Sequence, residues 1–126
     1  MIFGTNIFIY ADRGVLSAKQ LIETAPEKAI SAVTYLEYVP FCRNKKEVQI
    51  FEKLLETYKF AIYDIDAAMS SQARQMVKDF ALSHRIEMAD ALIAATALAH
   101  DEMLCTSNVK HFLPISRIKL EIYSPL

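Results

Sequence analysis

The sequence predicts an α/β fold in which helices cover both faces of a mainly parallel sheet. Short apolar runs alternate with longer segments of helical periodicity along the 126 residues, and this alternation is typical of strand–helix–strand units. Hydrophobic residues make up 53% of the chain, which contains only two Gly and four Pro, so a disordered or turn-rich all-β chain is disfavoured. The length predicts one domain, residues 1–126, large enough to bury a core without disulfides.

Strands are expected where short apolar runs end at turn or capping residues. Met1-Ile2-Phe3 stops at Gly4-Thr5-Asn6, which indicates a buried strand followed by a turn. The last segment alternates apolar and polar residues, as a short edge strand does. The expected strands are residues 1–3, 29–33, 60–63, 103–105 and 118–123.

Helices are expected where apolar residues recur at intervals of three and four. The clearest case is the segment from Val48 to Tyr58. Thr5 or Asn6 can cap the first helix, and Asp66 can cap the fifth. The expected helices are residues 7–11, 17–24, 35–41, 48–58, 66–84 and 86–100.

Polar side chains follow three of the expected strands, and one more stands in an apolar helix. Gly4-Thr5-Asn6, Thr34-x-x-Glu37 and Thr106-Ser107-Asn108 come after the first, second and fourth strands, and Asp90 lies in the helix before the fourth. In open parallel sheets the functional crevice lies at the carboxyl ends of the strands. The sequence therefore predicts that two carboxylates and an amide converge there, as oxygen ligands for Mg²⁺ or Mn²⁺.

Each of these residues also has a purely structural interpretation. Thr34-x-x-Glu37 fits a capping box, although Pro40 would then lie inside the same helix. Asn108 fits a turn before Phe112. Asp90 lies in an Ala-rich helix, where a buried carboxylate needs a partner. That partner is either a metal ion or a basic side chain, Arg85 or Lys78.

Charge and cysteine content limit the other possibilities. The net charge of −1 and pI of about 6.3 disfavour a protein that binds nucleic acid through overall basic charge. Cys42 and Cys105 are best explained as buried thiols in a reducing cytosol. The three histidines show no metal-ligand spacing, so surface or capping roles are expected for them. The N-terminus does not look like a signal peptide, and no apolar stretch is long enough to span a membrane. A cytoplasmic protein without a membrane partner is expected.

Four segments together resemble the PIN-domain family, and within it the toxins of the VapC type. Residues 1–10 resemble the opening strand and the Asp-Thr-Asn turn of the family, and residues 31–37 the motif whose Glu is at the metal site. Residues 88–97 resemble the motif with an essential Asp, and residues 104–112 the motif in which Thr-x is followed by Asp or Asn. The motifs occur in the family's order and span nearly the whole chain.

The resemblance implies a PIN-like three-layer α/β/α fold with a four- or five-stranded mainly parallel sheet. It implies an endoribonuclease that uses Mg²⁺ or Mn²⁺, with metal ligands at Glu37, Asp90 and position 4. Asn108 would be an auxiliary catalytic residue, and Thr5, Asn6 and Thr106 would support the site. The implied partners are an RNA substrate and a small cognate antitoxin, with the chain as a homodimer or a heteromer with the antitoxin.

Three positions depart from the family pattern. Gly4 replaces the first metal-binding Asp, Asn108 stands where Asp is common, and His111 replaces a residue that is often acidic. Asp12 cannot substitute, because eight helical residues extend about 12 Å. We therefore expect a poor or inactive nuclease on an intact scaffold.

Two alternative functions remain open from the sequence. A PIN scaffold that no longer cuts would hold RNA or a protein, and the cluster of Arg43, Lys45 and Lys46 would then contact RNA, although such a run is usually a solvated turn. A PIN nuclease of general RNA processing is the other alternative. Apolar stripes at 48–58 and near Leu21-Ile22 would receive an antitoxin helix, or would pack in the domain's own core.

Overall fold

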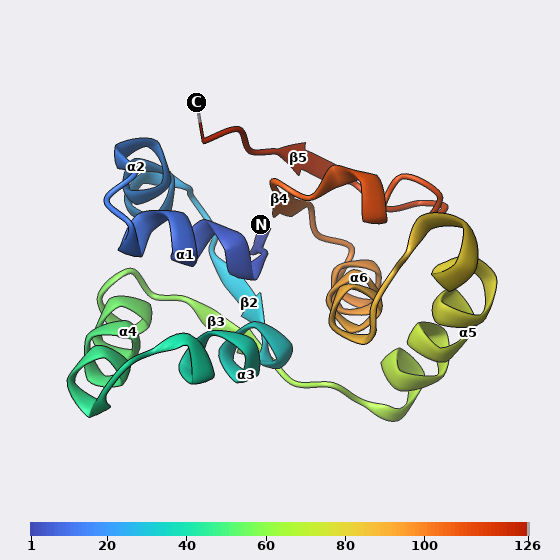
Figure 1. Cartoon of the computed structure of the whole chain (residues 1–126), viewed down its shortest axis with the longest axis horizontal. Coiled ribbons are helices and arrows are strands. Elements are labelled where there is room, and N and C mark those ends of the chain that lie inside the picture. The colour runs from blue at the N-terminus through green and yellow to red at the C-terminus, as the bar shows by residue number, and fades with distance from the viewer. Residues whose placement is uncertain (126) are drawn as a thin grey trace.

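The computed structural model describes residues 1–125 and contains a five-stranded sheet in the order β3-β2-β1-β4-β5. Every neighbouring pair of strands is parallel. The predicted parallel α/β sheet is thus confirmed, and β5 lies at an edge, as expected (Figure 1). The strands are β1 (Ile2–Phe3), β2 (Ala29–Ser31), β3 (Ala61–Tyr63), β4 (Leu104–Thr106) and β5 (Leu120–Ile122).

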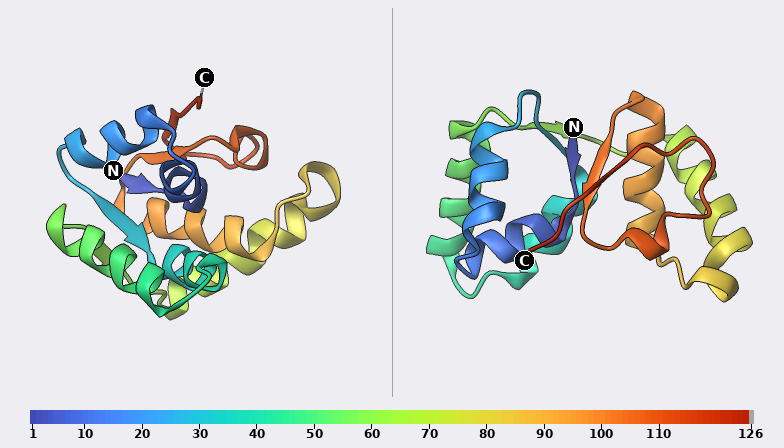
Figure 2. Two further views of the ribbon diagram at one scale, coloured as in Figure 1. Left: turned by 60° about the vertical axis from the view of Figure 1, so that its left-hand side comes forward. Right: turned by 90° about the horizontal axis from the view of Figure 1, so that it is seen from above.

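Helices cover both faces of this sheet and complete the three layers. Figure 2 shows α1 to α4 on one side of the strands and α5 and α6 on the other. None of the helices in residues 1–125 is long and apolar enough to cross a membrane. The helices are α1 (Thr5–Asp12), α2 (Leu16–Thr24), α3 (Ala32–Phe41), α4 (Lys45–Thr57), α5 (Ala67–His84), α6 (Met88–His100) and the 3₁₀ turn η1 (Val109–His111).

The alternation of side chains along the strands divides the core into two clusters. Ile2 and Leu104 face α5 and α6, where they pack with alanines of α6. The next residue of each strand, Phe3 and Cys105, faces α1 to α4. Successive strand side chains point to opposite faces, so a single sheet buries two apolar layers and holds its strand ends in fixed positions.

Several helix starts differ from the sequence prediction, and three of them lie near the predicted site. The strand expected over 29–33 ends at Ser31, whose hydroxyl accepts a hydrogen bond from the Val33 N–H at 3.1 Å and caps α3. Gly4, not Thr5 or Asn6, is the N-cap of α1, and no side chain caps that helix. Helix α6 begins at Met88, two residues later than expected. At α1 and α3, the side chains assigned to caps in the prediction are free for other contacts.

Candidate functional site

The carboxyl ends of β1, β2 and β4 meet at one edge of the sheet, and a cavity of about 300 Å³ opens there. All seven residues predicted for the site line this one cavity, although they come from widely separated parts of the sequence. They are Gly4, Thr5, Asn6, Glu37, Asp90, Thr106 and Asn108. Asp12 lines a different cavity, which agrees with its exclusion as a substitute ligand.

Glu37 is held by a side chain from another helix. The Thr5 hydroxyl donates a hydrogen bond to Glu37 Oε1 at 2.5 Å, which ties α1 to α3. Thr34 is buried within α3 and lies 3.4 Å from the Thr5 hydroxyl. The capping-box interpretation of Thr34-x-x-Glu37 is therefore wrong, because Ser31 caps the helix and Glu37 points into the cavity.

Asp90 occupies the first turn of α6 and makes two polar contacts. Its Oδ2 accepts a hydrogen bond from the Glu87 backbone N–H at 3.3 Å and lies 2.8 Å from His111 Nδ1. The side chains of Asp90 and His111 are 19% and 27% exposed. The partner of Asp90 is thus neither Arg85 nor Lys78, the two expected from sequence.

His111 belongs to the site, which corrects the surface or capping role expected for it. Its Nδ1 lies 3.1 Å from Asn108 Nδ2, in addition to the contact with Asp90. The sequence did contain one indication that position 111 belongs to the site, because the family often has an acidic residue there. Glu87 also lines the cavity, and no spacing in the sequence indicated it.

The loop after β4 is organised by its own side chains. The Thr106 hydroxyl accepts a hydrogen bond from the Asn108 N–H at 3.0 Å, which fixes the turn that carries Asn108. Asn108 makes no side-chain capping bond to η1. Asn6 from α1 reaches the same loop, with its Nδ2 3.5 Å from the Ser107 hydroxyl. Thr106 and Asn6 therefore hold this loop in place, and their support of a metal site stays a prediction.

Gly4 continues the pairing of β1, because its N–H donates to the Cys105 carbonyl at 2.9 Å. Its φ of −70° is open to any residue, so the backbone does not require glycine here. A Cβ at position 4 would lie 3.3 Å from the Cys105 carbonyl oxygen and 3.6 Å from Thr106 Oγ1. A side chain here requires the Cys105 carbonyl oxygen to move by a few tenths of an ångström, whereas the distance to Thr106 Oγ1 is an ordinary contact.

The donor set of the cavity suits a hard cation that keeps most of its water. Mg²⁺ is commonly held by one or two carboxylates, with water and substrate phosphate completing its shell. Glu37 and Asp90 supply two carboxylates, and Asn108 supplies an amide. Within residues 1–125, no three His, Cys, Asp or Glu side chains gather closely enough to hold a metal ion. Burial raises the pKa of the nearby Cys105 thiol to about 11, so it offers no thiolate at neutral pH.

Comparison with known proteins agrees with this architecture. The family model of the PIN domain matches residues 1–113. Ribonuclease VapC10 of Mycobacterium tuberculosis is 29% identical over 119 residues, covering 91% of this chain and 87% of that protein. Ribonuclease VapC1 of Methanocaldococcus jannaschii is 31% identical over 107 residues, covering 83% of this chain and 76% of that protein.

A solved structure extends the similarity to the three-dimensional fold. A toxin–antitoxin complex from Klebsiella pneumoniae contains a chain with a TM-score of 0.77 and 28% identity, and the match covers 99% of this chain and 97% of that one. The family model, the two relatives and this structure each match most of the chain. The chain therefore belongs to the PIN-domain family, on its VapC branch.

Proposed function

We propose that this chain, acting as one domain over residues 1–126, is an endoribonuclease toxin that depends on a divalent metal and is weakened by Gly4. The observation that carries the proposal is the convergence of Glu37, Asp90 and Asn108 in one cavity at the strand ends. The relatives named ribonucleases support RNA as the substrate. Mg²⁺ or Mn²⁺ would be the metal.

The residues of the cavity have separate tasks in this function. Glu37 and Asp90 would hold the metal, which when bound activates water and stabilises charge on the phosphate. The Thr5 hydroxyl fixes the carboxylate of Glu37 by its hydrogen bond, and Thr106 fixes the loop that presents Asn108. Such supporting contacts orient the metal ligands, and their loss typically lowers metal affinity or activity about 10- to 100-fold.

Residual RNA cleavage tests this assignment. At high protein concentration with Mn²⁺, the chain is expected to cut RNA slowly, and a chelator or the Asp90→Asn substitution should abolish the cutting. Asp79→Asn, a change at an exposed residue of α5, is the matched control and should leave the rate unchanged. Cleavage that survives both the chelator and Asp90→Asn would place the chemistry elsewhere.

Partner binding has its own site in this proposal. A groove between α1, α2, α3 and α4 is lined by apolar side chains that include Ile22, Ile50 and Leu54. These residues come from the two segments noted in the sequence. Phe51 also lines the groove, but it is buried in the core, as Ile22 is, whereas Ile50 is exposed. An amphipathic helix of a cognate antitoxin would lie in this groove. The similar chain from Klebsiella pneumoniae belongs to a toxin–antitoxin complex, which supports an antitoxin partner. The chain would form a homodimer, or a heteromer with the antitoxin.

The Ile50→Asp substitution is expected to weaken antitoxin binding about tenfold or more. The new carboxylate would lie in the apolar groove without a partner of opposite charge on the bound helix. Ile50 is 57% exposed, so the fold should tolerate the change. Leu82→Asp, at a fully exposed position of α5, is the control. Equal antitoxin affinity of the two variants in a calorimetric titration would exclude the groove.

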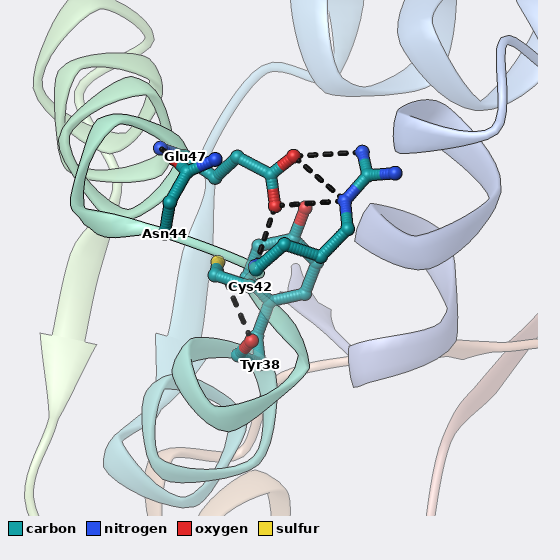
Figure 3. A network of polar contacts seen from close by, with 5 residues as sticks. Tyr38, Cys42, Asn44 and Glu47 are labelled. Carbon is teal, nitrogen blue, oxygen red and sulfur yellow. Dashed lines mark hydrogen bonds and ion pairs between the residues drawn. The ribbon is translucent and has the colours of Figure 1, made fainter.

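A non-catalytic RNA-binding module is less well supported. Figure 3 shows the turn between α3 and α4, where the Glu47 carboxylate contacts a guanidinium group. That group belongs to Arg43, whose Nη2 lies 2.7 Å from Glu47 Oε2. The pairing lowers the pKa of Glu47 and raises the pKa of Arg43. One of the three basic residues of the expected cluster is thus engaged within the chain.

A further inference from the structure

We propose that Asp90, Asn108 and His111 form a mixed nitrogen–oxygen donor set, which makes this site prefer metals that accept imidazole over Mg²⁺. The proposal rests on the metal dependence in the proposed function and specifies the metal. It concerns His111, which has no part in the metal site of the proposed function, where Glu37 and Asp90 hold the metal.

The three side chains come from two separate elements and meet at one atom. Asp90 stands in the first turn of α6, whereas Asn108 and His111 lie at the start and end of η1. His111 Nδ1 lies 2.8 Å from Asp90 Oδ2 and 3.1 Å from the amide of Asn108. All three side chains line the cavity that also contains Glu37.

These separations match the edges of a coordination octahedron. With ligands at about 2.1 Å from the ion, neighbouring donor atoms of an octahedral site lie about 3.0 Å apart. The distances of 2.8 and 3.1 Å are close to that value, and they are ordinary hydrogen-bond lengths as well.

The protonation of Nδ1 and the orientation of the Asn108 amide decide which contacts in this cluster are hydrogen bonds. A protonated Nδ1 donates to the Asp90 carboxylate but then faces the NH₂ of Asn108. An unprotonated Nδ1 accepts from that NH₂ but then faces a carboxylate lone pair. The oxygen and nitrogen ends of the Asn108 amide have nearly the same shape, so the amide can turn within the same space. With the amide turned, a protonated Nδ1 donates to both the carboxylate and the amide oxygen. With the amide turned and Nδ1 unprotonated, three lone pairs converge, and a cation takes the place of that proton.

The chemistry of the donors determines which cation this is. Carboxylate and amide oxygens suit Mg²⁺ and Mn²⁺, whereas imidazole suits Ni²⁺, Zn²⁺ and Fe²⁺, which also stand higher in the general affinity order. An acid at position 111 would make the set entirely oxygen. Histidine at this position therefore shifts the preference of the site away from Mg²⁺.

Metal titration without RNA tests the preference directly. Untagged full-length chain and its His111→Asp variant are titrated with Ni²⁺ and with Mg²⁺ in a calorimeter. We expect the chain to bind Ni²⁺ more tightly than Mg²⁺, and His111→Asp to reduce the Ni²⁺-to-Mg²⁺ affinity ratio about tenfold or more. His84→Asp, which alters an exposed histidine at the end of α5, should leave the ratio unchanged.

The nitrogen resonances of His111 provide a second readout that does not depend on activity. Adding Zn²⁺ should shift the Nδ1 resonance of His111 and leave that of His84 in place. An unchanged affinity ratio in His111→Asp, together with an unmoved Nδ1 resonance, would overturn the proposal while leaving a metal-dependent nuclease intact. A chain that binds neither ion would overturn both.

Discussion

The Gly4→Asp variant is expected to bind Mn²⁺ about 10- to 100-fold more tightly than the chain itself, the range over which single groups around a metal site usually act. The new carboxylate would start from the carboxyl end of β1, beside the cavity that already contains Glu37 and Asp90. The φ of −70° at position 4 suits any residue, and the new Cβ requires the Cys105 carbonyl oxygen, at 3.3 Å, to move by a few tenths of an ångström. Calorimetric titration with Mn²⁺ measures the gain.

Two further substitutions at the same position separate charge from shape. Gly4→Ala adds only the Cβ, and Gly4→Asn adds the same shape as aspartate without its charge. Neither should raise Mn²⁺ affinity by more than a few-fold, because a neutral amide is a weaker partner for a divalent cation than a carboxylate. A gain in Gly4→Asn equal to that in Gly4→Asp would show that the added side chain acts by packing. No gain in any of the three would show that position 4 is not a ligand position.

The Phe3→Ala variant is expected to lose about 3–5 kcal/mol of unfolding free energy, the usual cost of truncating a buried phenylalanine. Phe3 is fully buried, and its ring packs edge-on against Phe60 at 5.4 Å and lies 6.3 Å from Phe8. A cavity here would remove contacts between β1 and the layer formed by α1 to α4. Urea unfolding followed by circular dichroism measures the change.

The position of Phe3 makes this loss relevant to the site as well. Phe3 directly precedes Gly4, so the β1 end that presents position 4 depends on this packing. Leu82→Ala, at a fully exposed position, is the control and should change stability by no more than about 0.5 kcal/mol. A loss below about 1 kcal/mol in Phe3→Ala would mean that β1 is not anchored by its aromatic neighbours.

The parallel sheet and the position of the candidate site could be predicted from the sequence because both depend on coarse patterns. Apolar runs separated by helical periodicity indicate parallel strands, and parallel strands bring their carboxyl ends to one edge. The polar residues after β1, β2 and β4 therefore had to meet, and they do so in one cavity. Segment order and apolar spacing were sufficient for this step.

The individual contacts could not be predicted, because they depend on competition between nearby polar side chains. Ser31 and Thr34 are both good caps, and the choice of Ser31 leaves Glu37 to bond Thr5 across a sequence separation of 32 residues. Asp90 had basic side chains nearby in sequence, yet its partner is His111, which the chain brings back through β4 and η1. Spacing along the chain does not specify such pairs, since they form only after the sheet is assembled.

Cleavage of RNA by the chain and by Gly4→Asp, each with Mn²⁺ and with a chelator, tests the central claim most directly. The claim is that the cavity at the ends of β1, β2 and β4 is a metal-dependent nuclease site that lacks one carboxylate. We predict that Gly4→Asp cuts RNA much faster than the chain itself, and that the chelator stops it. Equal cleavage by the two proteins, or cleavage that persists without metal, would contradict it.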